Sequence, residues 1–345
     1  MRKVLALTLI AILAIGVIGL AAGTKDHPYR LILVPSTDQE TVGRIGDEIA
    51  AALTKITGLE IEAKMTPNIP AAVAEYSTAA EDVFGFLSTK AYLQAFEATL
   101  AETSKHLDLA LISARNGYIG YWAAYYYRRA DGFQTLEDLV GKTWGYAYPG
   151  STSGYAMPSV TLQNMGIVPG GTLETGSHNA SMVALYNGDV DFCTGYYSPP
   201  MAPIVLRQLG LRWEFGMPIE LGLWNDDPET DFGETEGLIT GPLAWYVKDL
   251  RQPFLVDGTY PDIVEKIGIL ALSDVIPNDG VSFVPGFPAA DKALIVNAIK
   301  AFITTDEGKA TFGDPDFYEW DNVQDATDAD YDNYRMAKGY DVPER

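Results

Sequence analysis

The feature that most constrains this chain is an alternation of apolar, strand-like runs with segments that have helical spacing. LILVP at residues 31–35 predicts a strand, residues 40–58 predict a helix that closes on Gly58, and the alternating stretch LEIEAKM predicts the next strand. A helix near residues 70–79, the strand VFGFL and a helix from residue 89 continue the series. Strands that alternate with helices form parallel sheets covered on both faces, so we predict an α/β fold.

The alternation then restarts, which indicates a second unit. LDLALIS and YIGYWAAYYYRR are two strand-like runs with no helix between them, and KTWGYAYP begins a second series that ends with VDFCTGYY. We predict two lobes, each a mostly parallel sheet flanked by helices, with a ligand cleft between them. Lobe 1 takes residues 24–117 and 269–345, and lobe 2 takes residues 118–268.

Two stretches fit this alternation less well. Residues 212–268 are rich in Trp, Gly, Pro and acidic residues, so we interpret them as an excursion inserted into lobe 2. The carboxylates at 226–236 lack the spacing of a calcium-binding EF-hand loop, so a solvated acidic loop is expected there. Residues 314–345 are acidic and aromatic without clear periodicity, and we expect them to wrap the surface.

The first residues, MRKVLALTLIAILAIGVIGLAAG, have the layout of a secretory signal: a basic start, an apolar run and small residues before Thr24. Residues 1–23 are therefore predicted to be a signal peptide, and the protein is predicted to be periplasmic or otherwise extracytoplasmic. The apolar run is also long enough to stay as an uncleaved membrane anchor. Cys193 is the single cysteine, so an intramolecular disulfide is excluded and a buried apolar role is expected.

The net charge restricts the partners. A formal charge of −22, from 46 acidic and 24 basic residues, argues against nucleic acid and against anionic membrane surfaces. The three histidines, His27, His106 and His178, are far apart and lack a paired ligand motif. We therefore expect no metal and no cofactor, and a bound anion must be held locally by amides and hydroxyls.

A turn rich in hydroxyl groups provides such a place. GSTSGYAMPSV, residues 150–160, follows a predicted buried strand and begins a helix, with Ser153 as the predicted N-cap. Free N–H groups at a helix start, together with the hydroxyls of Ser151, Thr152 and Ser153, suit a tetrahedral oxyanion. The alternative is a capped helix with two hydroxyls that have no ligand role.

Two catalytic or nucleotide-binding motifs fail at this turn. The G-x-S-x-G nucleophile elbow is absent because Thr152 stands at its centre, and the Walker A pattern fails because Leu136 replaces its first glycine. Ligands of open α/β sheets bind beyond the carboxyl ends of the strands. Ser36, Ser88 and Tyr197 follow or end other predicted strands, so they are further candidates.

Several segments together resemble the periplasmic substrate-binding proteins of ABC transporters for phosphonate, phosphite and related phosphorus oxyanions. The most diagnostic is DLVGKTWGYAYPGSTSGYAMP. LVPSTDQE, FGFLSTKAYLQA, GSHNASMVALYNGDVDF and SDVIPNDGVSF follow the order found in that family. The resemblance implies a two-lobed, hinge-closing binding protein of the type II periplasmic fold, a monomer that delivers a small anionic ligand to a membrane permease. Membrane contact is then expected through the permease or a retained N-terminal segment.

The resemblance also implies roles for individual residues. Ser151, Thr152 and Ser153 would hold the phosphorus-bound oxygens, His178 would donate from the same lobe, and Tyr92 would reach in from the other lobe. If His178 donates, its protonated form should bind more strongly, so affinity should weaken as pH rises past about 6.5.

The sequence departs from the family pattern in two places. TPNIPAAV has Asn68, Ile69 and Pro70 where family members often carry a tyrosine. GYYSPP offers no carboxylate near Ser198, where aminophosphonate binders place an acid, so a compact ligand such as phosphite or methylphosphonate is expected.

Two other functions stay open. One is a ligand-sensing partner of a membrane kinase, which would share the same pocket. The other is an exported serine hydrolase that uses Ser151 or Ser153 with His178 and Asp191.

Overall fold

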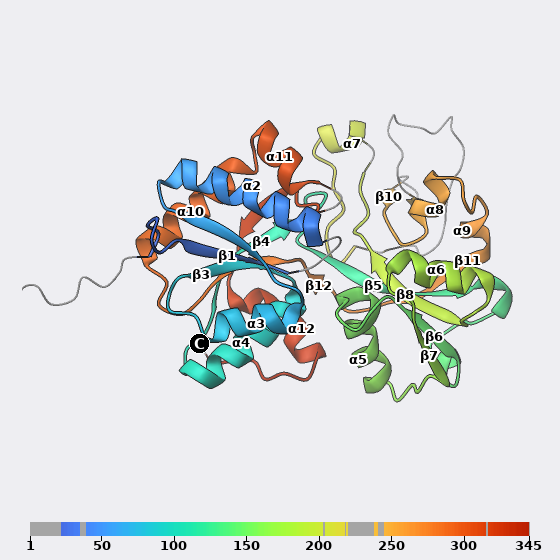
Figure 1. The fold of residues 1–345 in the computed structure, drawn as a ribbon. Coiled ribbons are helices and arrows are strands. Elements are labelled where there is room, and N and C mark those ends of the chain that lie inside the picture. The colour runs from blue at the N-terminus through green and yellow to red at the C-terminus, as the bar shows by residue number, and fades with distance from the viewer. Residues whose placement is uncertain are drawn as a thin grey trace, which may run out of the picture.

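The computed structural model describes residues 22–344 except 35–38, 203, 218, 220–237, 241–244 and 315–316. It consists of two lobes that lie side by side, each built on a mixed sheet flanked by helices (Figure 1). The predicted two-lobed α/β fold is thereby confirmed. The predicted signal segment lies outside the described residues except for Ala22 and Gly23. Within the described part, no helix is long and apolar enough to cross a membrane.

Lobe 1 contains a six-stranded sheet in the order β14-β4-β13-β3-β1-β2. Its strands are β1 (Tyr29–Leu33), β2 (Ile61–Met65), β3 (Val83–Leu87), β4 (Asp108–Ala114), β13 (Gly280–Phe283) and β14 (Asn322–Asp325). β1 pairs in parallel with β2 and β3, whereas β13 is antiparallel to β3 and β4, and β14 is antiparallel to β4.

Helices cover both faces of this sheet. They are α2 (Gln39–Thr57), α3 (Ile69–Ser77), α4 (Thr89–Thr103), α10 (Ala289–Phe302), α11 (Asp306–Phe312) and α12 (Asp332–Ala337). α2 buries an apolar stripe at helical spacing that includes Val42, Ile45, Ile49 and Leu53. It ends at Gly58, whose φ of +75° lies in the left-handed region that glycine adopts without strain.

Lobe 2 contains a second sheet in the order β11-β5-β8-β6-β7, with β12 paired to β5. Its strands are β5 (Gly120–Arg128), β6 (Thr143–Tyr146), β7 (Gly171–Glu174), β8 (Phe192–Tyr197), β11 (Ile267–Leu272) and β12 (Ile276–Pro277). Its helices are α5 (Met157–Asn164), α6 (His178–Asn187), α7 (Ile204–Gln208), α8 (Gln252–Val256) and α9 (Ile263–Lys266). A separate pair, β9 (Leu238–Thr240) and β10 (Trp245–Val247), falls in the predicted excursion. The sequence patterns missed the short strand β7.

Both sheets are mixed rather than mostly parallel. The chain passes from β4 directly into β5 without a crossover helix, and β5 then pairs antiparallel with β8, β11 and β12. Parallel pairing requires a crossover connection, so it is confined to the β1, β2, β3 and β6, β7, β8 groups, where helices intervene.

The return from lobe 2 to lobe 1 comes later than residue 269. β11 pairs with β5, so residues 269–272 belong to the second sheet. The chain then runs through β12 into β13 of the first sheet. The C-terminal stretch also differs from the expected surface wrap, because Phe317, Trp320, Tyr331 and Tyr334 are buried in the lobe 1 core. Large aromatic side chains gain most from such burial.

Candidate functional site

A cavity of about 660 Å³ lies between the two lobes. Its polar lining from lobe 1 includes Ser88, Arg115, Asp279, Glu319 and Asp321. Its polar lining from lobe 2 includes Ser151, Thr152, Ser153, His178, Tyr196, Ser198 and Lys248. Residues of both lobes therefore line the same cavity.

The hydroxyl turn enters the cavity from lobe 2. Residues Thr152–Ala156 form one turn of π-helix, η3, which runs directly into α5. The N-cap is Ser151 rather than the predicted Ser153, because the Ser151 Oγ accepts a hydrogen bond of 3.0 Å from the Gly154 N–H. The wider turn joins the Ala156 N–H to the Ser151 carbonyl at 2.9 Å. Single π-turns are frequent at functional sites.

This turn leaves hydrogen-bond donors available. Within the described residues, the N–H groups of Thr152 and Ser153 find no acceptor, as expected for the first residues of a helix. The side chains of Ser151, Thr152 and Ser153 are 5%, 8% and 4% exposed and line the cavity. The turn thus presents amide and hydroxyl donors that carry no charge of their own.

His178 lies against the same turn. Its Nε2 is 3.1 Å from the Ser151 Oγ, and its ring fits between two glycines. A Cβ on Gly154 would lie 2.9 Å from the His178 Cε1, and one on Gly195 would lie 3.4 Å from the Nδ1. The Nδ1 is buried and has no hydrogen-bond partner among the described residues.

Burial decides the charge of this histidine. Loss of hydration lowers the pKa of His178 from 6.5 to about 4, so the imidazole is neutral at physiological pH. Our expectation that affinity follows a titration near pH 6.5 is therefore wrong for this environment. His178 can still donate, but as a neutral imidazole, and either nitrogen can carry its proton.

The topology of lobe 2 explains why the turn and His178 meet. β6 and β7 are neighbouring parallel strands, so their carboxyl ends lie at the same edge of the sheet. The chain leaves β6 into η3 and leaves β7 into α6, whose first residue is His178. Ser177 caps α6 by accepting from the Ala180 N–H at 3.1 Å. Two helix starts are thereby brought together at the cleft.

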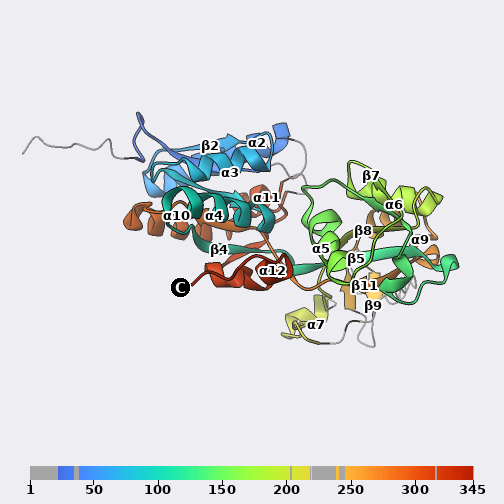
Figure 2. The same cartoon turned by 90° about the horizontal axis from the view of Figure 1, so that it is seen from below.

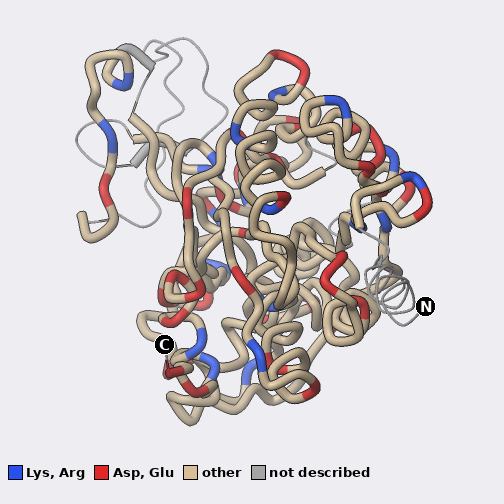
Figure 3. Tube along the Cα trace, turned by 90° about the vertical axis from the view of Figure 1, so that its left-hand side faces the viewer, with Lys and Arg blue, Asp and Glu red and all other residues tan. Residues whose placement is uncertain are grey.

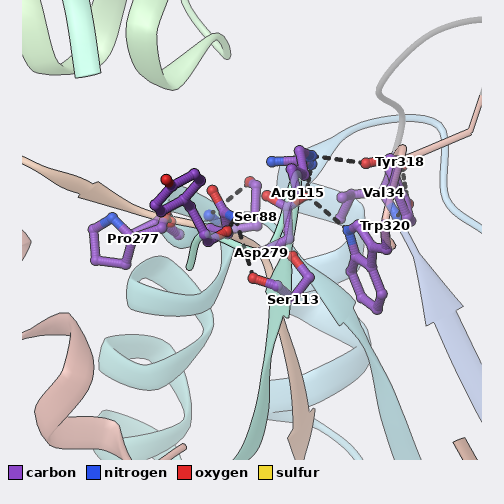
Figure 4. A network of polar contacts seen from close by, with 12 residues as sticks. Val34, Ser88, Ser113, Arg115, Pro277, Asp279, Tyr318 and Trp320 are labelled. Carbon is purple, nitrogen blue, oxygen red and sulfur yellow. Dashed lines mark hydrogen bonds and ion pairs between the residues drawn. The ribbon is translucent and has the colours of Figure 1, made fainter. Parts of the chain in front are cut away.

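The lobe 1 wall is a connected polar network (Figure 4). The Arg115 guanidinium, which follows β4, binds the Asp279 carboxylate at 2.5 Å and the Tyr318 carbonyl at 2.8 Å. The Tyr318 hydroxyl in turn donates to the Val34 carbonyl at 2.6 Å, at the end of β1. Four segments far apart in the sequence, at Val34, Arg115, Asp279 and Tyr318, are thus fixed against one another at the cavity.

The other predicted site residues differ in whether they line the cavity. Ser88 lines the cavity and also caps α4. Tyr92 does not reach it: the ring is fully buried against Tyr331, and its hydroxyl donates to Asp328 at 2.8 Å. Tyr197 is 1% exposed and packs on Trp122 in the lobe 2 core. Ser36 lies outside the described residues.

On β8, Tyr196, the neighbour of Tyr197, is the tyrosine that lines the cavity. Side chains alternate between the two faces of a strand, so a shift of one residue along β8 exchanges a core ring for a cleft ring. Sequence reasoning identified the right strand end and the wrong face.

Several functional candidates were missed altogether. Lys248 comes from the predicted excursion, and Arg115, Asp279, Glu319 and Asp321 come from lobe 1. Arg115 could have been found, because it is a polar residue just past a predicted strand. It stands two positions after LDLALIS and directly after Ala114, where β4 ends. No local pattern indicated Glu319 or Asp321, because they lie in a stretch without periodicity.

The geometry of a serine-hydrolase triad is not assembled here. Asp191 accepts from the Thr143 N–H at 2.8 Å, at the start of β6, whereas the hydroxyl turn follows the end of that strand. His178 is left without a partner on Nδ1 in the described part of the chain. A triad requires an acid that orients the histidine, and Asp191 does not do so.

Two sheets joined by crossing strands, with a polar cavity between the lobes, define the class of type II periplasmic binding proteins. Solved structures share this fold. A binding protein component of an ABC phosphonate transporter from Pseudomonas aeruginosa has a TM-score of 0.56 and 15% identity, over 90% of this chain and 84% of that chain. PhnD1 from Prochlorococcus marinus, solved in complex with methylphosphonate, has a TM-score of 0.55 and 13% identity, over 89% and 96% of the two chains.

Sequence comparisons identify the family. The model of the ABC transporter, phosphonate, periplasmic substrate-binding proteins matches residues 31–331, and the chain belongs to this family. It is also similar to the phosphate-import protein PhnD of Mycolicibacterium smegmatis, with 29% identity over 174 residues. That alignment covers 47% of this chain, which spans about half (52%) of the length of this curated relative.

Proposed function

We propose that the protein binds a small phosphorus oxyanion in the cleft and delivers it, outside the cytoplasm, to the membrane permease of an ABC importer. The observation that carries this proposal is the hydroxyl turn, where the Thr152 and Ser153 N–H groups find no acceptor in the described part of the chain and His178 Nε2 lies 3.1 Å from the Ser151 Oγ. Charge-assisted hydrogen bonds from such donors favour a tetrahedral anion. Methylphosphonate in the Prochlorococcus neighbour and phosphate import by the mycobacterial relative support the ligand class.

The charge of the cleft bears on which ligand is preferred. Among the described residues that line the cavity, two side chains are cationic, Arg115 and Lys248, and three are anionic, Asp279, Glu319 and Asp321; Arg115 is already paired with Asp279. With His178 neutral, this described lining is formally negative. A ligand that brings its own cationic group would offset this charge better than a bare anion.

This consideration changes the sequence-based ligand preference. The sequence offered no acid near Ser198, but Glu319 and Asp321 line the cavity from the opposite lobe. Tyr197, one of the two rings adjacent to Ser198, packs in the core rather than in the cavity. We therefore propose that 2-aminoethylphosphonate binds at least as tightly as methylphosphonate, with its ammonium near Glu319 and Asp321.

Calorimetric titration tests both parts of the proposal. Phosphate, phosphite, methylphosphonate and 2-aminoethylphosphonate are titrated into the parent protein and into Glu319→Gln, which keeps the side-chain shape. We expect the variant to lose about threefold to tenfold in affinity for the aminated ligand, and to keep or gain affinity for the others. A folded parent that binds none of the four would remove the phosphorus-oxyanion assignment.

Delivery and export need separate measurements. Ligand uptake that depends on this protein and on an ABC permease in the same cells would support the importer, whereas ligand-dependent activation of a membrane kinase would support the sensor. We further propose that residues 1–23 are removed on export, which the mass of the exported chain tests.

A further inference from the structure

A second set of contacts joins the lobes away from the ligand cavity. The Lys90 ammonium, on α4 of lobe 1, donates to the Pro149 carbonyl of lobe 2 at 2.6 Å. The Lys338 ammonium, at the end of α12, donates to the Ala156 carbonyl at 2.8 Å. Figure 2 shows α12 next to α5, where the C-terminal end of lobe 1 meets lobe 2.

The two acceptors bracket the hydroxyl turn. Pro149 lies two residues before Ser151, and Ala156 is the last residue of the π-turn. Lobe 1 therefore holds the turn at both ends through side chains, while the donors between those ends face the cavity.

The described residues that line the small cavity around the two lysines are polar in part and include no carboxylate. Both line a small cavity of about 160 Å³ that shares no lining residue with the ligand cavity. Its other polar groups are the hydroxyls of Tyr155 on η3, Ser159 on α5, Tyr334 on α12 and Tyr340, and the amide of Gln94 on α4. The ammonium groups thus rely on backbone carbonyls.

We propose that Lys90 and Lys338 are positioning residues that tie closure of the lobes to the geometry of the hydroxyl turn. Any rotation that opens the cleft on this side moves the two amines away from Pro149 and Ala156. Their contacts then add to the stability of the closed form alone, and ligand affinity includes them. The affinity test of this inference rests on the proposed function, whereas the scattering test rests only on the contacts between the lobes.

Removing either amine should weaken binding without touching the ligand site. In Lys90→Met and Lys338→Met the apolar stem is kept and the donor is lost. We expect each variant to bind methylphosphonate about threefold to tenfold more weakly than the parent in calorimetry at pH 9, where the Lys338 amine still donates to Ala156 but its buried charge no longer opposes closure. Lys105→Met, an exposed lysine of the same lobe, is the matched control and should bind like the parent. At pH 7, where Lys338 is itself charged, Lys338→Arg keeps both the donor and the charge and should retain most of the affinity.

X-ray scattering without ligand provides a readout that does not need the ligand assignment. The double variant Lys90→Met/Lys338→Met should have a larger radius of gyration than the parent and the Lys105→Met control. If the parent binds none of the four phosphorus oxyanions, the proposed function fails, while the scattering measurement still tests the lobe contact.

A pH profile separates positioning from simple packing. Burial, followed by the nearby charge of Lys90, lowers the pKa of Lys338 to about 8, and burial also lowers the pKa of Lys90. An opened form that hydrates Lys338 restores its ordinary pKa of 10.5, so deprotonation favours the closed form. The parent should therefore gain methylphosphonate affinity relative to Lys338→Arg between pH 8 and 9.5. Ligand ionisation cancels in this ratio, and Arg does not titrate there.

Three results would overturn the proposal. They are parent-like affinity in both methionine variants, an unchanged radius of gyration in the double variant, and a flat parent-to-arginine ratio up to pH 9.5. Melting temperatures recorded alongside show whether a loss of affinity reflects unfolding of a methionine variant. If it does, the affinity of Lys338→Arg and the scattering of the folded fraction test the proposal instead.

Discussion

Ser151 is the helix cap, a role that the sequence alone assigned to Ser153. Its Oγ accepts the Gly154 N–H as the helix cap and also lies beside His178 at the cavity. Thr152 and Ser153 line the cavity without capping the helix. The three hydroxyls should therefore respond differently to mutation.

We expect Ser151→Ala to lower both stability, by about 1 kcal/mol, and ligand affinity. Thr152→Ala and Ser153→Ala should leave the melting temperature nearly unchanged and lower affinity by roughly tenfold to a hundredfold, because each removes a charge-assisted hydrogen bond of roughly 1.5–3 kcal/mol. Calorimetric titration with parallel thermal melts measures both quantities. Full affinity in all three variants would place the ligand elsewhere.

His178 should make the protein sensitive to acid. Its pKa of about 4 in the folded protein lies below its ordinary value of 6.5, so the unfolded chain takes up the proton first as pH falls. The stability that the neutral ring provides is complete above about pH 6.5 and is lost as pH falls towards 4. Urea unfolding from pH 4 to 7 should give a slope up to about 1.4 kcal/mol per pH unit smaller in His178→Asn than in the parent. Equal slopes would contradict a buried neutral imidazole.

At the scale of elements, β8 shows how a strand divides its residues between core and cleft. Tyr196 lines the cavity and lies edge-on to His178, with ring centroids 5.7 Å apart, whereas Tyr197 packs on Trp122. Both rings come from the same predicted strand end.

This alternation gives a matched pair of variants. Tyr196→Ala should weaken ligand binding because it removes a wall of the cavity, with a small effect on stability. Tyr197→Ala should lower the free energy of unfolding by about 3–5 kcal/mol, the range for a buried aromatic ring, and leave the affinity of the folded fraction close to that of the parent. Urea unfolding and titration distinguish them, and the reverse pattern would mean that the faces of β8 are exchanged.

At the scale of the whole molecule, the charge and the two-lobed shape act together. Acidic and basic residues are interspersed along the trace, without one continuous basic face in this view (Figure 3), although the chain carries a net charge of −22. Under the proposed function, an anion would have to be held by local donors, and polar side chains from both lobes line the cavity.

A ligand that contacts both lobes should favour the closed arrangement by its differential affinity for it. We expect the radius of gyration in X-ray scattering to fall when a binding phosphonate is added. The Ser153→Ala variant at equal ligand concentration should show a smaller fall. A radius that stays constant while calorimetry records tight binding would exclude a closing clamp.

The sequence by itself determined most elements and led to the prediction of one site, which remains a prediction. Helical spacing and Gly58 defined α2, the apolar run VFGFL defined β3, and the Ser-Thr-Ser turn at a strand-to-helix junction indicated an oxyanion site. These features are local: they depend on side-chain periodicity and on backbone groups within a few residues, so the letters are sufficient to predict them.

The tertiary structure alone decided which residues share the cleft. Arg115 meets Asp279 across 164 positions of sequence, Glu319 arrives from a stretch without periodicity, and Tyr92 is held in the core by Asp328, 236 positions away. The face of β8 that lines the cavity was likewise beyond the sequence pattern. Such contacts depend on how whole elements pack, because burial of apolar area fixes the orientation of a strand or helix and carries its polar side chains with it.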